Sequence, residues 1–377
     1  MKQRSCIRRM STLYKAILLF LFTIVLCVAV TGSAAEPRIV AVGDVHGDLD
    51  SFVQILRRAG LVDLKQGWSG RDAILVQTGD FTDRGPKVRA VMDFLMSLQK
   101  EAPRQKGRVI VLMGNHEAMN IFGDLGSVTA DDFASFADGK SEARQKSAYK
   151  AYSELPAPDV RQSEAEWMKS HPAGFVEYRD AMGPAGKYGK WLRTLPAVAK
   201  VGDSIFLHGG INPALSTWSL DKINEGIATE IKAFDAYKSY MMDQKIALPF
   251  FTLQELIRAA GSVEDKKPLE GFLNIGGWLS IHPDGPLWFR GYAQWSDTEG
   301  LNSIQQLTTA FKVSRFVVGH TPQIGRIVKR FDGQVVLIDT GMLSSYFKGG
   351  QASALQIGNG SVTAIYANGK AEPHDVR

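Results

Sequence analysis

Cysteine is almost absent from this sequence of 377 residues, since the only two, Cys6 and Cys27, lie before residue 36. A chain that has lost its first 35 residues can therefore form no disulfide and can use no cysteine as a nucleophile. Long apolar runs are equally scarce. The one long run extends from Ala16 to Val30 and is shorter than the roughly 20 residues that a membrane-spanning helix needs.

The first 35 residues have the three-part plan of a secretory signal peptide. The apolar run follows a basic start, and small residues from Thr31 to Ala35 precede a cleavage point after Ala35. We therefore expect residues 1–35 to be a signal peptide and the product to be periplasmic or secreted, with no membrane attachment after cleavage. An uncleaved N-terminal anchor is the alternative.

Net charge is also missing once this leader is set aside. The whole sequence has 44 Lys and Arg against 39 Asp and Glu, and the leader holds five of the basic residues and none of the acidic ones. The remaining 39 and 39 cancel, so the formal charge of +5 belongs to the leader. No basic surface for nucleic acid is implied, and we expect no nucleic-acid partner.

What the sequence does have is an alternation of strand and helix patterns from Arg38 onward. We expect strands at 39–42, 73–76 and 108–113, with helices from Leu49 to a stop at Gly60 and at 88–98. Such alternation predicts an α/β fold with parallel strands whose carboxyl ends meet at one rim. Later strands are expected at 204–207, 315–318 and 335–338, followed by a hairpin of 354–357 and 362–366.

Two stretches break this alternation, roughly residues 118–190 and 215–280. Both are polar and charged and contain no recognisable motif, and the strand patterns resume after each. We therefore expect helical insertions within one catalytic domain of residues 36–377, and not separate domains.

Polar clusters stand at the ends of five predicted strands: VGDVHGD (42–48), TGDFTDRG (78–85), MGNHEA (113–118), LHGG (207–210) and VGHT (318–321). A strand end rich in acid is unfavourable unless a cation lies there. Carboxylate, imidazole and amide donors suit two divalent ions of iron, zinc or manganese, with Asp80 as a bridge. Two such ions can activate a water and clamp a phosphate for in-line attack. The candidate ligands are Asp44, His46, Asp80, Asn115, His208 and His320.

Each cluster alone has a plainer interpretation, as a strand-end turn or a hydrogen-bonded histidine. Five in succession, with four of the seven histidines, favour a shared metal site. The other three histidines precede or follow loop residues, and we expect them to be solvated: His171, His282 and His374.

In this order the clusters resemble those of calcineurin-like metallophosphoesterases, on the phosphoprotein phosphatase branch, and most of all the Shewanella-like phosphatases. The resemblance covers residues 38–120 and 200–345. It implies a metallophosphoesterase-type β-sandwich with αββα layers and helical insertions over the site. It also implies that one ion is held by Asp44, His46 and Asp80, and the other by Asp80, Asn115, His208 and His320.

The same resemblance assigns the remaining roles. His116 would protonate the leaving oxygen, with Asp83 orienting it or sharing the proton, and an imidazole suits this task because its ordinary pKa is about 6.5. Arg84 would bind phosphate oxygens, since a guanidinium forms a planar fork. Arg290, in PLWFRGY, would be a second phosphate-binding arginine, with a surface salt bridge as the alternative.

Three departures bear on the substrate. Met113 stands where eukaryotic serine/threonine phosphatases carry arginine, IDTGM (338–342) replaces their C-terminal signature, and VGHTPQ has a single histidine. The resemblance therefore suggests phosphotyrosine or small phosphomonoesters as substrates, with phosphoserine or phosphothreonine also open. Asp339 either braces a ligand histidine or belongs to a strand-end turn.

The leading hypothesis is an exported dinuclear-metal phosphomonoesterase that acts as a protein phosphatase. A diadenosine tetraphosphate hydrolase or related phosphodiesterase is the second hypothesis, ranked lower because such relatives usually lack the carboxylate at Asp83. A non-catalytic exported metal-binding protein is the third, and the complete ligand set argues against it.

Overall fold

The computed structural model describes residues 37–156, 162–323, 325–358, 360–369 and 371–373. The described residues from Arg38 onward belong to one compact unit. The predicted signal peptide lies outside the described residues, as does His374. Within the described part of the chain, no helix has the length and apolar character needed to cross a membrane.

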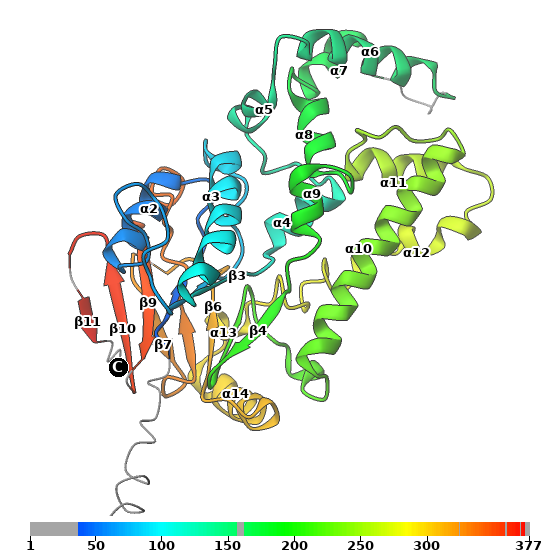
Figure 1. Ribbon diagram of the computed structural model, residues 1–377. Helices are drawn as coiled ribbons and strands as arrows, with labels where there is room; N and C mark the ends of the chain where they lie inside the picture. The colour runs from blue at the N-terminus through cyan, green and yellow to red at the C-terminus, as the bar shows by residue number, and fades with distance from the viewer. Residues whose placement is uncertain (1–36, 157–161, 324, 359, 370, 374–377) are drawn as a thin grey trace, which may run out of the picture. The chain divides into compact units, whose positions relative to one another are not determined.

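Two mixed sheets face each other, at the lower left in Figure 1. The first has the strand order β11-β10-β9-β1-β2-β3, and the second has the order β4-β5-β6-β8-β7. In the first sheet β1, β2 and β3 run parallel, and in the second β5, β6 and β8 do. The first-sheet strands are β1 (Ile39–Val42), β2 (Ile74–Gln77), β3 (Arg108–Val111), β9 (Ser353–Gly358), β10 (Ser361–Tyr366) and β11 (Ala371–Pro373). Those of the second are β4 (Val198–Val201), β5 (Ser204–Leu207), β6 (Arg315–Val318), β7 (Val328–Arg330) and β8 (Val335–Leu337).

Successive side chains of each strand point to opposite faces of its sheet, and this places one set between the sheets and the other against helices. Ile39 and Ala41 pack between the sheets, together with Phe206 and Val317 of the second sheet. Val40, one position along, faces the other way, into the core shared with helices α2 (Leu49–Arg58) and α3 (Val88–Glu101). The outer face of the second sheet packs against α14 (Asp297–Phe311). Because side chains alternate with period two, each sheet is apolar on both faces, and the predicted αββα sandwich is confirmed.

The sequence-based bounds agree closely with these elements. β1, β5 and β6 have the predicted bounds, β2 begins one residue later, and β3 ends two residues earlier. The predicted hairpin is the antiparallel pair β9–β10. Gly60 follows α2 with a φ of 66°, a left-handed conformation that glycine adopts without strain and that ends the helix.

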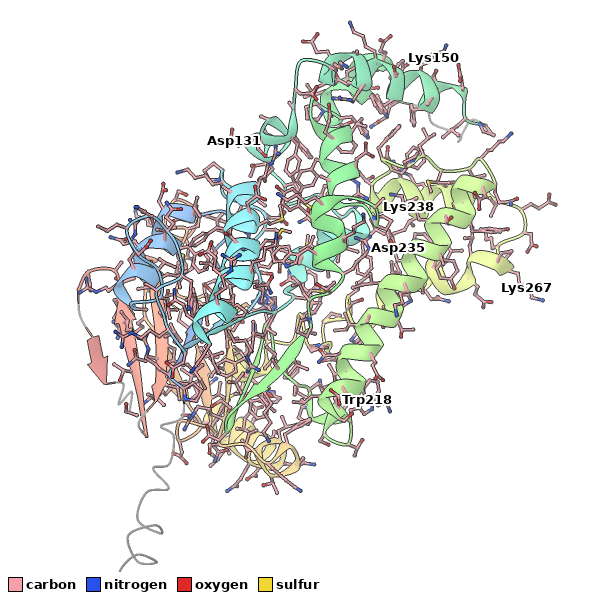
Figure 2. All side chains as sticks on the ribbon, viewed as in Figure 1. Asp131, Lys150, Trp218, Asp235, Lys238 and Lys267 are labelled. Carbon is pink, nitrogen blue, oxygen red and sulfur yellow. The ribbon has the colours of Figure 1, made fainter. Side chains whose placement is uncertain are left out.

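Helices occupy both stretches where the alternation breaks. The first contains α5 (Ala130–Phe136), α6 (Ser141–Glu154), α7 (Glu164–Ser170), α8 (Phe175–Met182) and α9 (Lys187–Leu192), and the second contains α10 (Leu220–Asp243), α11 (Leu253–Ser262) and α12 (Glu270–Leu273). The short helix α4 (Asn115–Phe122) packs against both α9 and α10. A two-pronged ion pair joins the groups, since Nε and Nη2 of Arg193 lie 2.8 and 2.9 Å from the Asp235 carboxylate. Figure 2 shows Asp235 on α10, toward α9. The two insertions therefore hold each other, and the second also contacts a sheet directly, since the Asn224 side chain of α10 bonds the backbone of Val198 in β4.

Candidate metal centre and active site

The predicted ligands all lie just beyond the carboxyl ends of strands. His208 follows β5 directly, Asp44 and His320 come two residues after β1 and β6, and Asp80 comes three residues after β2. Asn115 opens α4, four residues after β3. Because β1–β2–β3 and β5–β6 are parallel, these ends meet at one rim, and all six side chains are buried.

Asp80 stands at the middle of the cluster. Its Oδ2 lies 3.2 Å from Nε2 of His208 and 3.7 Å from Nε2 of His46. It is shared by two groups whose ligand atoms all lie within 4.8 Å of one another: His46, Asp80 and His116, and Asp80, His208 and His320. Asp44 joins the first group through Oδ2, 3.9 Å from Nε2 of His46. The arrangement offers two neighbouring cation positions with Asp80 common to both.

Backbone carbonyls fix which nitrogen of each ligand histidine is free. Nδ1 of His46 donates to the Thr82 carbonyl at 2.8 Å, and Nδ1 of His208 donates to that of Thr78 at 3.0 Å. Nε2 of His320 donates to the Trp288 carbonyl at 3.0 Å. Each ring therefore spends its N–H on the backbone and turns a lone pair toward the cluster, as metal-binding histidines do.

The free Nε2 of His208 faces other acceptors. Within 3.2 Å of Nε2 of His208 lie Nδ1 of His320 at 3.0 Å, Oδ1 of Asn115 at 3.0 Å and Oδ2 of Asp80 at 3.2 Å. One proton on Nε2 would satisfy only one of these three atoms, whereas a cation satisfies them all. The donor set thus fits divalent metal ions, and its mixture of carboxylate, imidazole and amide oxygen is compatible with iron, zinc or manganese.

The pKa shifts of the buried carboxyl groups also favour a metal site. Burial, and then the charges of Asp339 and Asp80, raise the pKa of Asp44 well above its usual range. Burial would also raise the pKa of Asp80, but the His208 and His116 imidazoles hold it well below its usual range. A buried acid cluster with this much mutual repulsion needs positive charge close to it.

The backbone at the site is strained. Five site residues have positive φ values between 45° and 70°: His46, Asp80, Asp83, Arg84 and His320. Non-glycine residues rarely adopt this conformation, and such strain concentrates at functional sites. Of the glycines before ligands, Gly79 has a φ of 93°. Gly319 allows close approach, because a Cβ there would lie 2.4 Å from Oδ1 of Asp44.

His116 differs from the ligand histidines in its partner. Its Nδ1 donates to Oδ2 of Asp83 at 2.7 Å, whereas the other three rings donate to backbone carbonyls. Its Nε2 lies 3.8 Å from Oδ2 of Asp80. Burial alone would lower the pKa of His116, but the Asp80 and Asp83 carboxylates raise it above the ordinary 6.5. An imidazole that stays protonated and is oriented by a carboxylate is suited to donate a proton.

Both predicted phosphate-binding arginines lie at the cluster. Nη1 of Arg84 is 2.6 Å from Nε2 of His46, and its guanidinium lies over the ring of Tyr346, 4.6 Å from the ring centre. Nη1 of Arg290 donates to the His320 carbonyl at 2.9 Å and to Oγ1 of Thr321 at 3.1 Å. Both of these partners of Arg290 are uncharged and lie at or next to a candidate ligand, which favours the phosphate-binding role over a surface salt bridge.

Two acidic residues have roles that the sequence did not specify. Glu117 is fully buried, and its carboxylate accepts from the backbone N–H groups of Asp80, Phe81, Thr82 and Gly114 at 2.8 to 3.0 Å. Glu117 therefore holds the Asp80 loop against α4. Its position in the GNHE motif was the feature of the sequence that could have indicated this role. Asp339 accepts from the Gly341 N–H at 2.9 Å, so it belongs to a strand-end turn. It also contacts the carboxyl group of Asp44, so the candidate ligand that it supports is an aspartate and not a histidine.

His171 contradicts the expectation that it is solvated, whereas His282 is exposed as expected. The His171 ring stacks on Trp167 with centres 4.1 Å apart, and Nε2 lies 3.3 Å from Oε1 of Glu255. Trp167 lies four residues before His171 in the chain, and Glu255 comes from the other insertion. Loop-like neighbours in the sequence therefore concealed a buried contact between distant segments.

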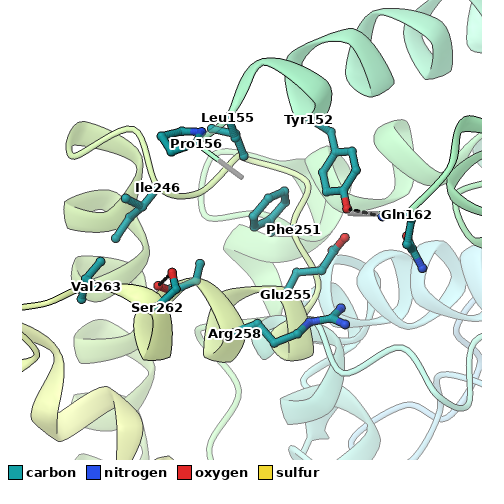
Figure 3. Close-up of a pocket in the computed structure, with 11 residues that line it drawn as sticks. Tyr152, Leu155, Pro156, Gln162, Ile246, Phe251, Glu255, Arg258, Ser262 and Val263 are labelled. Atoms are coloured by element: carbon teal, nitrogen blue, oxygen red, sulfur yellow. Dashed lines mark hydrogen bonds between the residues drawn. The ribbon is translucent and has the colours of Figure 1, made fainter. Parts of the chain in front are cut away.

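Glu255 also lines a cavity of about 260 Å³ between the end of α6 and α11 (Figure 3). Its walls are largely apolar and include Tyr152 and Phe251, and Arg258 lies at its edge. None of the predicted site residues lines it. The cavity belongs to the insertions and is separate from the metal cluster.

Comparison with known proteins adds to this geometry. The profile of the calcineurin-like phosphoesterase family matches residues 37–323. An uncharacterized protein of Schizosaccharomyces pombe is 30% identical over 332 residues, covering 86% of this chain and 78% of its own. Shewanella-like protein phosphatase 1 of Plasmodium berghei is 28% identical over 309 residues, covering 81% and 67%. A crystal structure of a mutant cold-active protein tyrosine phosphatase superposes with a TM-score of 0.62 at 25% identity, covering 90% of this chain and 80% of that one.

Proposed function

The chain belongs to the calcineurin-like phosphoesterase family and is a metal-dependent phosphoesterase, and from that premise we propose that it is a dinuclear phosphomonoesterase that dephosphorylates proteins. The single observation that carries the proposal is the cluster around Asp80, a carboxylate shared by two groups of candidate ligand atoms. The relatives named as protein phosphatases support the choice of a phosphorylated protein as substrate.

The ligands of the two ions are proposed as the sequence suggested: Asp44, His46 and Asp80 for one, and Asp80, Asn115, His208 and His320 for the other. When bound, two divalent ions supply Lewis acidity toward the phosphate and lower the pKa of water. His116 lies close enough to the first group to be a ligand itself. Its hydrogen bond to Asp83 favours the role of proton donor instead.

The chain's own residues complete the chemistry. His116, oriented by Asp83, donates a proton to the departing oxygen of the ester. The guanidinium groups of Arg84 and Arg290 hold the phosphate oxygens beside the cluster, and each offers several donors in one plane. The ligands and Asp83 are buried away from bulk solvent, which strengthens each of these interactions.

A substrate panel tests the proposal. The purified chain, loaded with manganese, is assayed on p-nitrophenyl phosphate, a phosphotyrosine peptide, a phosphoserine peptide and diadenosine tetraphosphate. We expect turnover of the phosphomonoesters, with phosphotyrosine preferred over phosphoserine. Preferential cleavage of the dinucleotide would replace this proposal with a phosphodiesterase, and metal binding without turnover of any substrate would leave only a binding protein.

Export is a separate part of the proposal. A basic start, an apolar run and small residues before Ala35 support a signal peptide that directs the enzyme to the periplasm or the medium. N-terminal sequencing of the protein recovered from a fractionated bacterial host checks it. We expect Glu36 as the first residue in the exported fraction, and a full-length chain in the membrane fraction would indicate an anchor.

A further inference from the structure

A chain of buried polar groups extends from His116 into the first insertion. Oδ2 of Asp83 accepts from Nδ1 of His116, and Oδ1 of the same carboxylate accepts from Nδ2 of Asn120 at 2.7 Å. Oδ1 of Asn120 in turn accepts from the hydroxyl of Tyr178. Asp83, Asn120 and Tyr178 are fully buried, and Tyr178 comes from α8, 58 residues after Asn120.

The direction of each hydrogen bond follows from chemistry. An ionised carboxylate can only accept, so Asn120 must turn its NH₂ group toward Asp83 and its carbonyl oxygen toward Tyr178. The Tyr178 hydroxyl must then donate. The Asn120 amide also donates to the His116 carbonyl at 2.9 Å, so both amide hydrogens are engaged. The Asp83 carboxylate and the His116 carbonyl thus set the direction of the amide, and the tyrosine hydroxyl holds its oxygen end in place.

Tyr178 is itself held firmly. Its ring meets Phe133 and Phe136 edge-on, with ring centres 5.3 and 5.2 Å away. The next residue, Arg179, donates from Nη1 to the backbone carbonyl of Asn120 at 3.0 Å. Burial raises the pKa of Tyr178 well above its usual value, so the hydroxyl keeps its proton.

We propose that Asn120 and Tyr178 are positioning residues for proton donation by His116, and that the first insertion thereby takes part in the reaction. The inference rests on the proposed phosphatase activity. The proposed effect acts through the orientation of Asp83. When the Asn120 amide is fixed, each oxygen of the Asp83 carboxylate has a donor, and the carboxylate keeps the His116 ring in one orientation. Loss of this hold reduces the fraction of molecules in which the imidazole can reach the leaving oxygen.

The test uses substrates that differ in their need for a proton. A serine alkoxide must be protonated as it leaves, whereas p-nitrophenolate is a stable anion and leaves without help. In Tyr178→Phe we expect kcat on a phosphoserine peptide to fall about tenfold, which is less than the roughly 100- to 10,000-fold contribution of a general acid because His116 itself is kept. We expect KM to change by less than about twofold and kcat on p-nitrophenyl phosphate to fall by less than about twofold. Metal content is measured on the same samples and should match the wild type.

Two further variants sharpen the experiment. Asn120→Ser breaks the chain from the other side while keeping the Tyr178 ring, so it carries the test if Tyr178→Phe does not fold. Added to Asn120→Ser, the Tyr178→Phe change should produce no further loss, because both act through one chain of contacts. Tyr188→Phe is the matched control, since that buried tyrosine of the same insertion donates to Asp93 at 3.0 Å instead. Its ratio of the two kcat values should equal that of the wild type.

The outcomes separate this inference from the function it rests on. An equal loss on both substrates, an unchanged ratio, or a fall in metal content in Tyr178→Phe overturns the positioning role alone. A wild-type chain, loaded with metal, that hydrolyses neither substrate overturns the proposed function, and this inference with it.

Discussion

The rim of the sheets and the helical insertions treat buried charge in opposite ways. At the rim, acceptor atoms of Asp80, His208 and His320 face one another, and protein groups alone do not satisfy them. In the insertions, charged groups find partners within the chain: Arg193 pairs with the Asp235 carboxylate, and the buried Arg179 donates to backbone carbonyls. The difference separates a region built around a ligand from one that is complete without it. Apart from Tyr178, whose contacts lead through Asn120 to Asp83, removing a side chain should cost activity in the first region and stability in the second.

The largest effect should follow from loss of the shared carboxylate. Because Asp80 belongs to both ligand groups, Asp80→Asn should leave almost no bound metal and only background activity. His320→Ala affects one group and should leave about one ion per chain. Metal analysis of the reconstituted proteins checks both. Two ions retained in His320→Ala would contradict the assignment.

The next effect separates a ligand from a proton donor. His116→Asn should lower kcat on a phosphoserine peptide by about 100- to 10,000-fold, the usual contribution of a general acid, while two ions remain bound. The measurements are steady-state kinetics on p-nitrophenyl phosphate and a phosphoserine peptide, together with metal analysis, and the alkyl ester should suffer more. A lost ion would place His116 among the ligands.

In the insertions the largest effect should be on stability. Trp167 is fully buried and stacked on His171, so Trp167→Ala should lower the free energy of unfolding by about 3–5 kcal/mol. The control is Trp218→Ala, which removes a half-buried tryptophan next to Lys222 and should cost about 1 kcal/mol. Urea unfolding measures both. If Trp167→Ala folds normally but loses its metal, the two regions are not independent.

The smallest effect concerns pH. Burial alone would raise the pKa of Glu255, but the nearby His171 imidazole lowers it below the ordinary 4.5. A lowered folded pKa means that the stabilisation is complete above pH 4.5 and is lost as pH falls toward the folded pKa. Glu255→Gln should therefore cost about 1–3 kcal/mol at neutral pH and flatten the loss of stability in acid. Urea unfolding midpoints between neutral pH and pH 3 test this, with Glu225→Gln, at an exposed position, as the control. An equally steep loss of stability in acid for Glu255→Gln and Glu225→Gln would refute the prediction.

The fold could be predicted well where strands lie inside a sheet. β1, β5 and β6 were bounded correctly because each has a neighbour on both sides. β1 and β5 are buried along their whole length and β6 in all but its first residue, which leaves short apolar runs. The three strands that were not anticipated, β4, β7 and β11, are all at sheet edges. An edge strand is paired on one side only, so polar residues such as Lys200 and Lys329 are tolerated and the pattern is weak.

At the site, the sequence identified residues by type and place but not their supports. Glu117 lies in a quoted motif, yet only the folded chain shows that it gathers four backbone N–H groups. Asn120 and Tyr178 have no motif at all. His171 was placed wrongly because its burial depends on Glu255, from a different insertion.

The order of the donor residues was determined by the sequence alone. The carboxyl ends of parallel strands lie at one rim of the sheet, so carboxylates and imidazoles that directly follow these strands in the sequence must lie near one another. Only the tertiary structure decided which nitrogen of each ring stays free, because the carbonyl that takes the other N–H comes from a distant segment, as Thr78 does for His208. The same is true of the contact between Tyr178 and Asn120: hydrogen bonds between remote segments leave no period or motif in the chain, since their geometry exists only after packing.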